Sequence, residues 1–220
     1  MKPPVQNPRS TIPQKRGQSN ELLSQAVEPV VLPPAMPVFK LKDLRPDVCV
    51  GSSDGSLANA LEPTKGRSIA RSFLRDLQDT SGFISDPRTT TLGLRFPFLI
   101  VEAKSGATGG NLYQAQNQAA VSGSSAIQIF RSLSDLHHAQ NPEIHNVSPL
   151  AFSVTTEGPI HELWLHFRRP NEEEFYMVCI GTWRTTMKDH SLNLIRHLSA
   201  VLRWGNDRLK DSIIDSLQAL

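Results

Sequence analysis

The spacing of apolar residues changes along the chain from the period of a helix to that of a strand. Within residues 66–78, Ile69, Phe73 and Leu77 recur every four positions, which predicts a helix with one apolar face. Residues 96–104 instead form a nearly continuous apolar run, as expected of a strand that is buried on both faces of a sheet. The chain therefore contains both kinds of element.

Glycines mark the ends of the segments around this buried strand. The apolar stretch 48–50 predicts a short earlier strand, and residues 51–55 after it are expected to form a turn. A glycine-rich loop follows the buried strand and leads to a long Ala-, Gln- and Ser-rich helix over about residues 111–136. Asn111 is the expected N-cap of this helix, and Gly123 is expected to interrupt it.

Period-two alternation dominates after Pro149, and helical spacing returns near the C-terminus. The predicted strands cover residues 151–156, 161–168 and 175–183. The predicted helices cover an apolar stripe within 194–202 and the final residues 207–220, with Gly205 bending or ending the first of them. We therefore expect a single α/β domain in which a central mixed β-sheet is flanked by helices.

The N-terminal residues differ in composition from the rest. Prolines stand there among Gln, Asn, Ser, Lys and Arg, and such a segment buries too little apolar surface to offset the entropy of ordering. We predict that residues 1–37 form a disordered or linker segment with a short helix over 21–31. The domain is then expected to span residues 38–220.

Overall charge and cysteine content restrict the class of protein. The 23 Lys and Arg residues against 21 Asp and Glu residues give a net charge of +2, which excludes binding of nucleic acid through bulk positive charge but not through a local stripe. Two cysteines, Cys49 and Cys179, exclude a disulfide scaffold and are expected to be buried apolar side chains in a reducing compartment. The N-terminus lacks a secretory apolar core, and no run approaches the roughly 18 apolar residues of a membrane span. We expect an intracellular protein of the cytoplasm or nucleus with no membrane partner.

The candidate chemistry lies where the buried strand ends. Glu102 and Lys104 are two residues apart, so they point to the same face of the strand, and both are costly to bury without a partner. A further carboxylate, Asp47, begins the earlier strand directly after Pro46. Two carboxylates and an ammonium group suit hydrolysis of phosphodiesters with a hard divalent cation such as Mg²⁺.

In this context the residues resemble the PD-(D/E)XK nuclease superfamily. Pro46-Asp47 is similar to its first motif and Glu102-Ala103-Lys104 to its second, and a glutamine-bearing helix follows. More narrowly, residues 45–51, 96–104, 111–118 and 151–158 resemble a group of poorly characterised fungal proteins to which such nuclease domains are assigned. The resemblance covers roughly residues 40–220.

The resemblance implies a restriction-endonuclease-like fold, Mg²⁺ or Mn²⁺ as cofactor and DNA or RNA as substrate. Asp47 and Glu102 would be metal ligands and Lys104 the catalytic lysine, so these three form the implied catalytic set. Gln114 and Gln118 resemble the glutamine often found near that site and would support substrate, unless they only form a polar helix face. Asp47 and Glu102 are far apart in the sequence, so the fold requires a helical insertion over residues 52–92.

A basic stripe precedes the buried strand. Arg67, Arg71 and Arg75 recur every four residues, with Lys65 just before them. This spacing either follows a nucleic-acid backbone, which makes binding dependent on salt, or forms an ordinary solvated helix face.

Two other functions remain as alternatives to a nuclease. The first is a catalytically inactive module of the same fold that binds nucleic acid or protein. The second is a serine hydrolase, because residues 51–55 satisfy the G-x-S-x-G pattern with Ser53 as nucleophile. His161 and His166 do not have the spacing of a zinc protease, and His137, His138 and His145 are expected at the surface. The three tryptophans are expected in the core.

Overall fold

The computed structural model describes residues 46–83, 85, 93–140, 150–170 and 172–220. All of them belong to one compact unit, Leu41–Leu220. The disordered segment predicted for residues 1–37, its helix at 21–31 and His145 lie outside the described residues.

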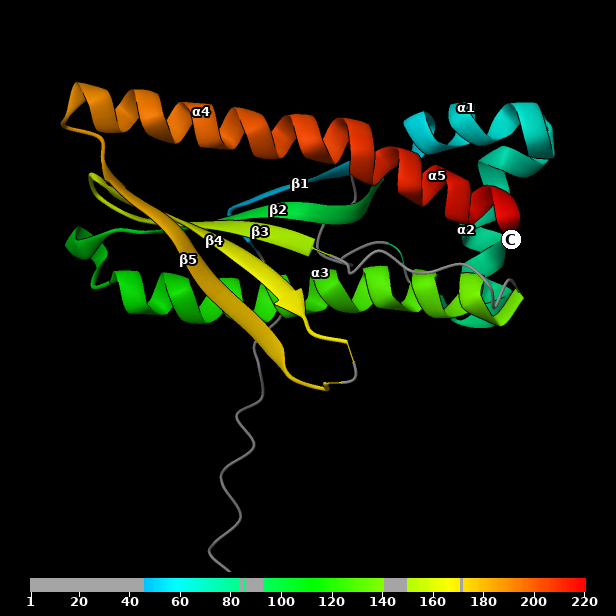
Figure 1. The fold of residues 1–220 in the computed structure, drawn as a ribbon, viewed down its shortest axis with the longest axis horizontal. Coiled ribbons are helices and arrows are strands. Elements are labelled where there is room, and N and C mark those ends of the chain that lie inside the picture. Colours follow the sequence, from blue (N-terminus) through cyan, green and yellow to red (C-terminus); the bar gives the residue numbers. More distant parts are fainter. Residues whose placement is uncertain (1–45, 84, 86–92, 141–149, 171) are drawn as a thin grey trace, which may run out of the picture. The chain divides into compact units, whose positions relative to one another are not determined.

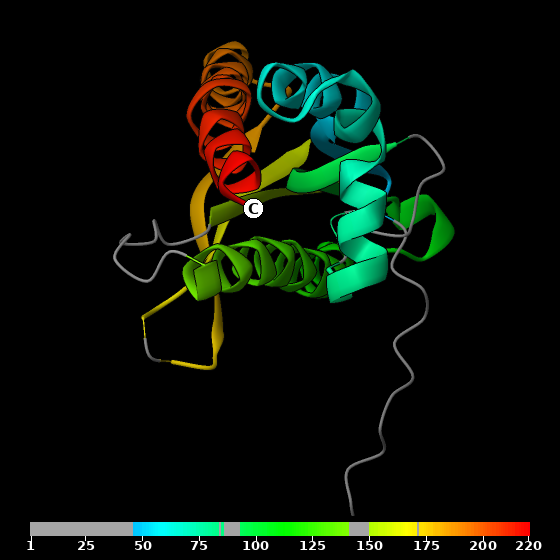
Figure 2. The ribbon, with the colours of Figure 1, turned by 90° about the vertical axis from the view of Figure 1, so that its right-hand side faces the viewer.

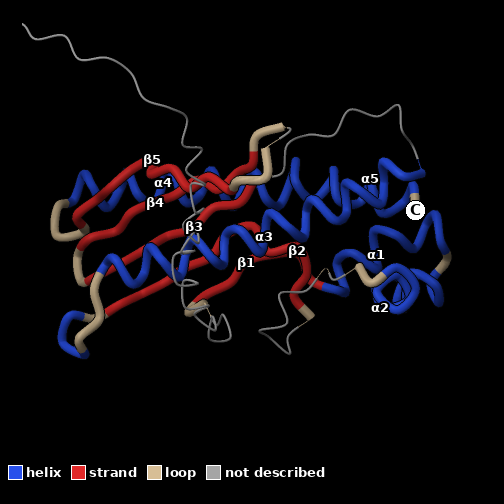
Figure 3. The backbone as a smooth tube through the Cα atoms, turned by 90° about the horizontal axis from the view of Figure 1, so that it is seen from below, coloured by secondary structure: helices blue, strands red, loops and turns tan. Residues whose placement is uncertain are grey.

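A mixed sheet of five strands forms the centre of this unit (Figure 1), as the sequence predicts. Its strands lie in chain order, and only the second and third of them run parallel to each other. They are β1 (Val48–Ser53), β2 (Leu94–Lys104), β3 (Leu150–Glu157), β4 (Ile160–Arg168) and β5 (Phe175–Arg184). Strands β1 and β5 therefore form the two edges (Figure 3).

Helices cover both faces of the sheet. The helices are α1 (Asp54–Lys65), α2 (Arg67–Ser81), α3 (Leu112–Gln140), α4 (Lys188–Trp204) and α5 (Lys210–Ala219), with a 3₁₀ turn, η1 (Gly106–Thr108), and a π-helical turn, η2 (Gly205–Leu209). Figure 2 shows α3 beneath the sheet and α1, α4 and α5 above it. Helix α3 is the crossover that a parallel β2–β3 pair requires. No helix of the described ranges is both long and apolar enough to cross a membrane.

The core joins every layer. Its fully buried large side chains come from α1, β2, α3, β4 and α5, and they include Leu57, Phe96, Ile127, Leu163 and Leu217. Ring contacts extend this core, since Phe96 lies 6.0 Å from Phe83 and 6.4 Å from Phe130 between ring centroids. The predicted insertion between the two acidic residues is helical, because α1 and α2 lie between β1 and β2.

Two predicted breaks are wrong, and close packing of a glycine explains each. Residues 51–53 continue β1 where a turn was expected; at Gly51 an added Cβ would lie 2.5 Å from the carbonyl oxygen of Arg95. Helix α3 continues through Gly123, where a Cβ would lie 2.3 Å from Nδ1 of His166. Each glycine therefore allows a close approach within an element and does not end it.

Other predictions need correction at the level of single side chains. Ile69 is 56% exposed, because α2 buries Ala70 and Leu74 instead. His137 is buried, since it continues the inward stripe of Phe130 and Leu133 on α3.

Cysteine and tryptophan positions also differ in part from expectation. Cys179 on β5 is exposed, whereas Cys49 on β1 is half-buried. Trp183 is in the core, and Trp204 packs partly buried against it. Near the C-terminus, α4 ends at Trp204 with Gly205 as its C-cap, as predicted, and the π-helical turn η2 joins it to α5.

Candidate active site

Asp47 joins the start of β1 to the end of β2. The two strands are antiparallel with Val48 opposite Val101, which places Asp47 next to the last residues of β2. Its Oδ2 accepts a hydrogen bond of 2.6 Å from the backbone N–H of Ala103. This bond continues the β1–β2 pairing with a side chain and holds the carboxylate beside Glu102 and Lys104.

Glu102 is the buried acid of the site. It is 2% exposed, and its Oε1 accepts a hydrogen bond of 3.1 Å from the hydroxyl of Ser122 on α3. Burial raises the pKa of Glu102 above its ordinary value, the nearby charge of Asp47 adds to the rise, and Ser122 and Lys104 oppose it. The carboxylate therefore lies where its negative charge is incompletely compensated.

Lys104 ends β2 on the same side as Glu102. Its Nζ donates a hydrogen bond of 3.3 Å to the carbonyl oxygen of Ala103, and its charge stabilises ionised Glu102. Glu157 is paired with Lys104 across β2 and β3, and its Oε2 accepts a hydrogen bond of 2.8 Å from the backbone N–H of Leu112. The structure thus brings Asp47, Glu102 and Lys104 together and fixes the start of α3 beside them.

The donor set fits a hard divalent cation. Asp47 and Glu102 offer carboxylate oxygens, and Mg²⁺ is commonly held by one or two carboxylates with waters and substrate phosphate completing its coordination. Among the described residues no group of three or more His, Cys, Asp or Glu side chains forms a site. A cation here would therefore depend on water and substrate oxygens for the rest of its coordination.

The two glutamines proposed to support substrate have different surroundings. Gln114 forms a reciprocal cap with Asn111: Oδ1 of Asn111 accepts from the N–H of Gln114 at 2.9 Å, and Oε1 of Gln114 accepts from the N–H of Asn111 at 3.2 Å. Gln118 is exposed and lies one helical turn before Ser122, the residue that contacts Glu102. Of the two, Gln118 is the one whose amide is not used to cap α3.

A buried polar network adjoins Glu102, and sequence reasoning missed it. Thr155 is the partner of Glu102 in β3. Its hydroxyl donates a hydrogen bond of 2.9 Å to Oε2 of Glu162 and accepts one of 3.0 Å from Nε1–H of Trp164. Gln116 on α3 donates 2.8 Å to the same oxygen of Glu162. Alternation places Glu162 and Trp164 on one face of β4, but only the strand register shows that this face meets Glu102.

A cavity of about 350 Å³ begins at Asp47 and follows β1. Its lining includes Asp47, Cys49, Gly51 and Gly93. Burial, together with the charge of Glu102, raises the pKa of the Cys49 thiol to about 11, so this cysteine stays protonated and is no nucleophile. The cavity gives an extended ligand space to lie along the β1 edge, starting from Asp47.

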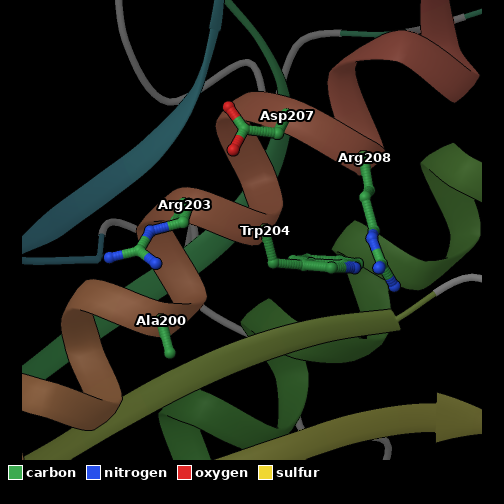
Figure 4. Close-up of a pocket in the computed structure, with 5 residues that line it drawn as sticks. All are labelled: Ala200, Arg203, Trp204, Asp207 and Arg208. Atoms are coloured by element: carbon green, nitrogen blue, oxygen red, sulfur yellow. The ribbon is translucent and has the colours of Figure 1, made fainter.

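A second cavity of about 300 Å³ lies on α4 and η2, away from the acidic residues (Figure 4). Ala200, Arg203, Trp204, Asp207 and Arg208 line it. In Figure 4 Arg208 extends beside the far end of the Trp204 ring, while Arg203 points to the other side of the helix. The two guanidinium groups therefore do not converge on one point.

The basic stripe is not beside the acidic residues. Arg67, Arg71 and Arg75 are exposed on α2, whereas Lys65 is half-buried with Nζ 4.3 Å from the ring centroid of Phe73. Asp47 precedes β1, and α1 and α2 follow its opposite end (Figure 1). A six-residue strand spans about 20 Å, so the stripe lies roughly that far or farther from Asp47 along the sheet.

Ser53, the nucleophile of the serine-hydrolase alternative, and the two histidines of β4 have local structural roles. Oγ of Ser53 caps α1 by accepting a hydrogen bond of 3.1 Å from the N–H of Ser56. His161 lies 3.2 Å from Oγ1 of Thr185, and His166 lies 2.7 Å from Oγ of Ser153. Since positions 161 and 166 point to opposite faces of β4, the two histidines do not share a site.

Comparison with known proteins gives one match. No curated protein and no solved structure matches the chain. The sequence profile of a family described as a domain of unknown function, DUF7924, matches residues 15–217. This match includes the whole of the described sheet and both acidic residues, Asp47 before β1 and Glu102 near the end of β2. The chain therefore belongs to the DUF7924 family.

Proposed function

We propose that this protein is a metal-dependent nuclease that hydrolyses phosphodiester bonds in DNA or RNA. Asp47 and Glu102 would hold Mg²⁺ or Mn²⁺, and Lys104 would be the catalytic lysine. The proposal includes a restriction-endonuclease-like fold for the domain.

The hydrogen bond of 2.6 Å from the Ala103 N–H to Asp47 is the observation that carries the proposal. Without it, Asp47 and Glu102 are only two acids far apart in the sequence. With it, two carboxylates of neighbouring strands lie beside an ammonium group at one end of the sheet. Such a set of side chains supports phosphodiester hydrolysis. The sheet itself does not require it, because burial of the Glu102 carboxylate is unfavourable for folding.

Each residue has a separate part in the proposed reaction. Asp47 and Glu102 would hold a divalent cation, which would supply Lewis acidity to the scissile phosphate and lower the pKa of a bound water. Ser122 orients Glu102 through Oε1, which leaves Oε2 for the cation. Lys104, whose hydrogen bond to the Ala103 carbonyl is long at 3.3 Å, would donate instead to the attacking water or to the negative charge that develops on the phosphate. Gln118, one helical turn before Ser122 on α3, would hydrogen-bond the substrate.

The test is cleavage of supercoiled plasmid, single-stranded DNA and single-stranded RNA with Mg²⁺, Mn²⁺ or EDTA. We expect cleavage that requires the cation and that falls by about two to three orders of magnitude in Lys104→Ala and Glu102→Gln. Lys188→Ala and Glu62→Gln remove the same charges at exposed positions on α4 and α1 and serve as matched controls.

The outcomes separate the proposal from its alternative. Cleavage that survives both site substitutions, or that EDTA does not affect, contradicts the proposed site. Retained nucleic-acid binding without cleavage in the wild type identifies the inactive binding module instead.

A further inference from the structure

The outer edge of β5 is long and apolar. The strand has ten residues, whereas β1 at the other edge has six. Phe175, Val178 and Ile180 are 43%, 45% and 44% exposed, and Cys179 between the last two is exposed as well. A long apolar edge with unpaired backbone groups is a template for another strand, so proteins that remain monomeric usually shorten or charge such edges.

Charge is distributed unevenly along this strand. Exposed Glu173 and Glu174 precede it, and exposed Arg184 ends it. None of these three side chains forms an ion pair within the described residues. One end of the edge thus carries Glu173 and Glu174 beside the Arg169–Glu172 ion pair, the middle is apolar, and the other end carries Arg184.

We propose that the β5 edge is a dimerisation surface that pairs antiparallel with β5 of a second copy of this chain. A parallel arrangement would place like charges together at both ends. An antiparallel arrangement about a twofold axis near Cys179 instead brings Glu174 of one protomer close to Arg184 of the other, because the two residues lie five positions on either side of Cys179. The exposed apolar centre then meets its own copy.

The same geometry limits the assembly to two copies. The pairing of β5 with β4 shifts register between Leu163 and Trp164, so β5 carries a bulge at its centre that increases the local twist. A twisted, bulged edge does not template an open stack of flat strands. The twofold contact uses the β5 edge of both copies and leaves only the short β1 edges outside.

Cys179 gives a direct measurement of this register. Directly opposite residues of antiparallel strands have Cα atoms about 4.5–5.5 Å apart, so two Cys179 thiols across the axis are within reach of a short bismaleimide. Cys49 is unreactive by comparison, because its thiol is half-buried and its pKa is raised to about 11.

The experiment combines light scattering of the full chain with cross-linking by bismaleimidoethane. We expect a dimer at micromolar concentration and a cross-linked dimer that Cys179→Ser abolishes and Cys49→Ser does not. Glu174→Arg and Arg184→Glu should each raise the dissociation constant about tenfold or more, because each replaces two attractive pairs with repulsive ones. The double variant restores opposite charges and should restore the dimer.

Circular dichroism of each variant checks that these exposed substitutions leave the fold intact. A monomer at 100 μM would overturn the proposal. A dimer that neither the charge substitutions nor Cys179→Ser affects would overturn it equally, because the contact would then lie elsewhere. The proposal is independent of the proposed nuclease function, and loss of cleavage does not bear on it.

Discussion

At the scale of single residues, the carboxylate of Glu102 combines nearly complete burial with incomplete compensation of its charge. Ser122 supplies one hydrogen bond and Lys104 a nearby positive charge, yet burial and Asp47 still raise its pKa. A group that is unfavourable in the free protein but suited to a cation is expected at a functional site, where stability is given up for activity.

Glu102→Gln should therefore stabilise the metal-free protein. An acid whose pKa is raised by folding loses folded-state stability as the pH rises above its unfolded value, so at neutral pH the wild type carries this cost and the amide does not. We expect a melting temperature higher by a few degrees, given that about 1 kcal/mol corresponds to roughly 2–4 °C in a domain of this size. Differential scanning calorimetry in EDTA measures it.

Saturating Mn²⁺ should reverse the order of the two proteins, since it stabilises only a folded chain that binds it. Glu62→Gln on the exposed surface of α1 is the control and should melt like the wild type under both conditions. A lower melting temperature for Glu102→Gln in EDTA would show that the charge of Glu102 is well compensated and has a structural role.

His166 makes the stability of the sheet sensitive to acid. Burial lowers its pKa to about 4, so the folded protein keeps it neutral while the unfolded chain protonates it near pH 6.5. The contribution of neutral His166 to the free energy of unfolding is complete above pH 6.5. It is lost as the pH falls toward 4 and amounts to about 3 kcal/mol in all.

Urea unfolding at intervals from pH 7 to pH 5 tests this window before most carboxylates titrate. His166→Gln should flatten the pH dependence of the free energy of unfolding, whereas His138→Gln on the exposed side of α3 should not. Burial also lowers the pKa of His161, so this residue adds to the pH dependence in both proteins. The difference in slope between the wild type and His166→Gln therefore measures the effect of His166 alone. Equal slopes would contradict the assignment.

Residue patterns indicated part of the site. Asp47, Glu102 and Lys104 could be found because two of them share a strand face and the third follows a proline before the preceding strand. Ser122 and the network of Thr155, Glu162, Gln116 and Trp164 could not, because their contacts depend on which strands are neighbours and in which register. Period-two alternation gives the face of a side chain but not its lateral partner.

At the scale of elements, Gly123 of α3 shows why a local pattern does not distinguish a helix break from a close contact. A glycine in a polar, Ala-rich helix has the same local pattern whether it ends the helix or lets another side chain approach. Here the ring of His166 on β4 occupies the space where a Cβ of residue 123 would stand. The decisive contact comes from a strand more than forty residues later in the chain, which no local pattern contains.

Gly123→Ala should destabilise the protein although alanine favours a helix. The gain in helix propensity is about 1 kcal/mol, but the Cβ would lie 2.3 Å from Nδ1 of a buried ring that is held by Ser153. Overpacking of this kind costs about 1–3 kcal/mol or more, so after the gain in propensity we expect a net loss of up to about 2 kcal/mol in urea unfolding.

The matched control for Gly123→Ala is Gln128→Ala, at an exposed position of the same helix, which should change stability by less than about 0.5 kcal/mol. The double variant Gly123→Ala/His166→Ala should lose less stability than the sum of the two single losses, because removing the ring makes room for the Cβ. A stabilised Gly123→Ala would show that the ring can move and that propensity dominates.

At the scale of the whole molecule, the acidic site and the basic stripe lie at different ends of β1. Asp47 begins the strand, and α2 is reached only after the strand and α1 (Figure 1). A nucleic acid that contacts both must therefore extend along the protein for roughly 20 Å or more, a length of several nucleotides. Binding and cleavage should then be separable by substitution.

Arg67→Gln/Arg71→Gln/Arg75→Gln tests this separation. If the stripe neutralises backbone phosphates, the triple variant should bind labelled DNA or RNA more weakly, and the slope of log affinity against log salt should become shallower by about 2–3. Cleavage at saturating protein concentration should stay close to that of the wild type, while Glu102→Gln should bind nucleic acid normally but not cleave it.

The control Lys188→Gln/Arg196→Gln/Lys210→Gln removes the same charge from α4 and α5 and separates the stripe from the effect of net charge alone. Equal slopes for the two triple variants would show that α2 presents only a solvated face, and the substrate path would then have to follow the cavity along β1 instead.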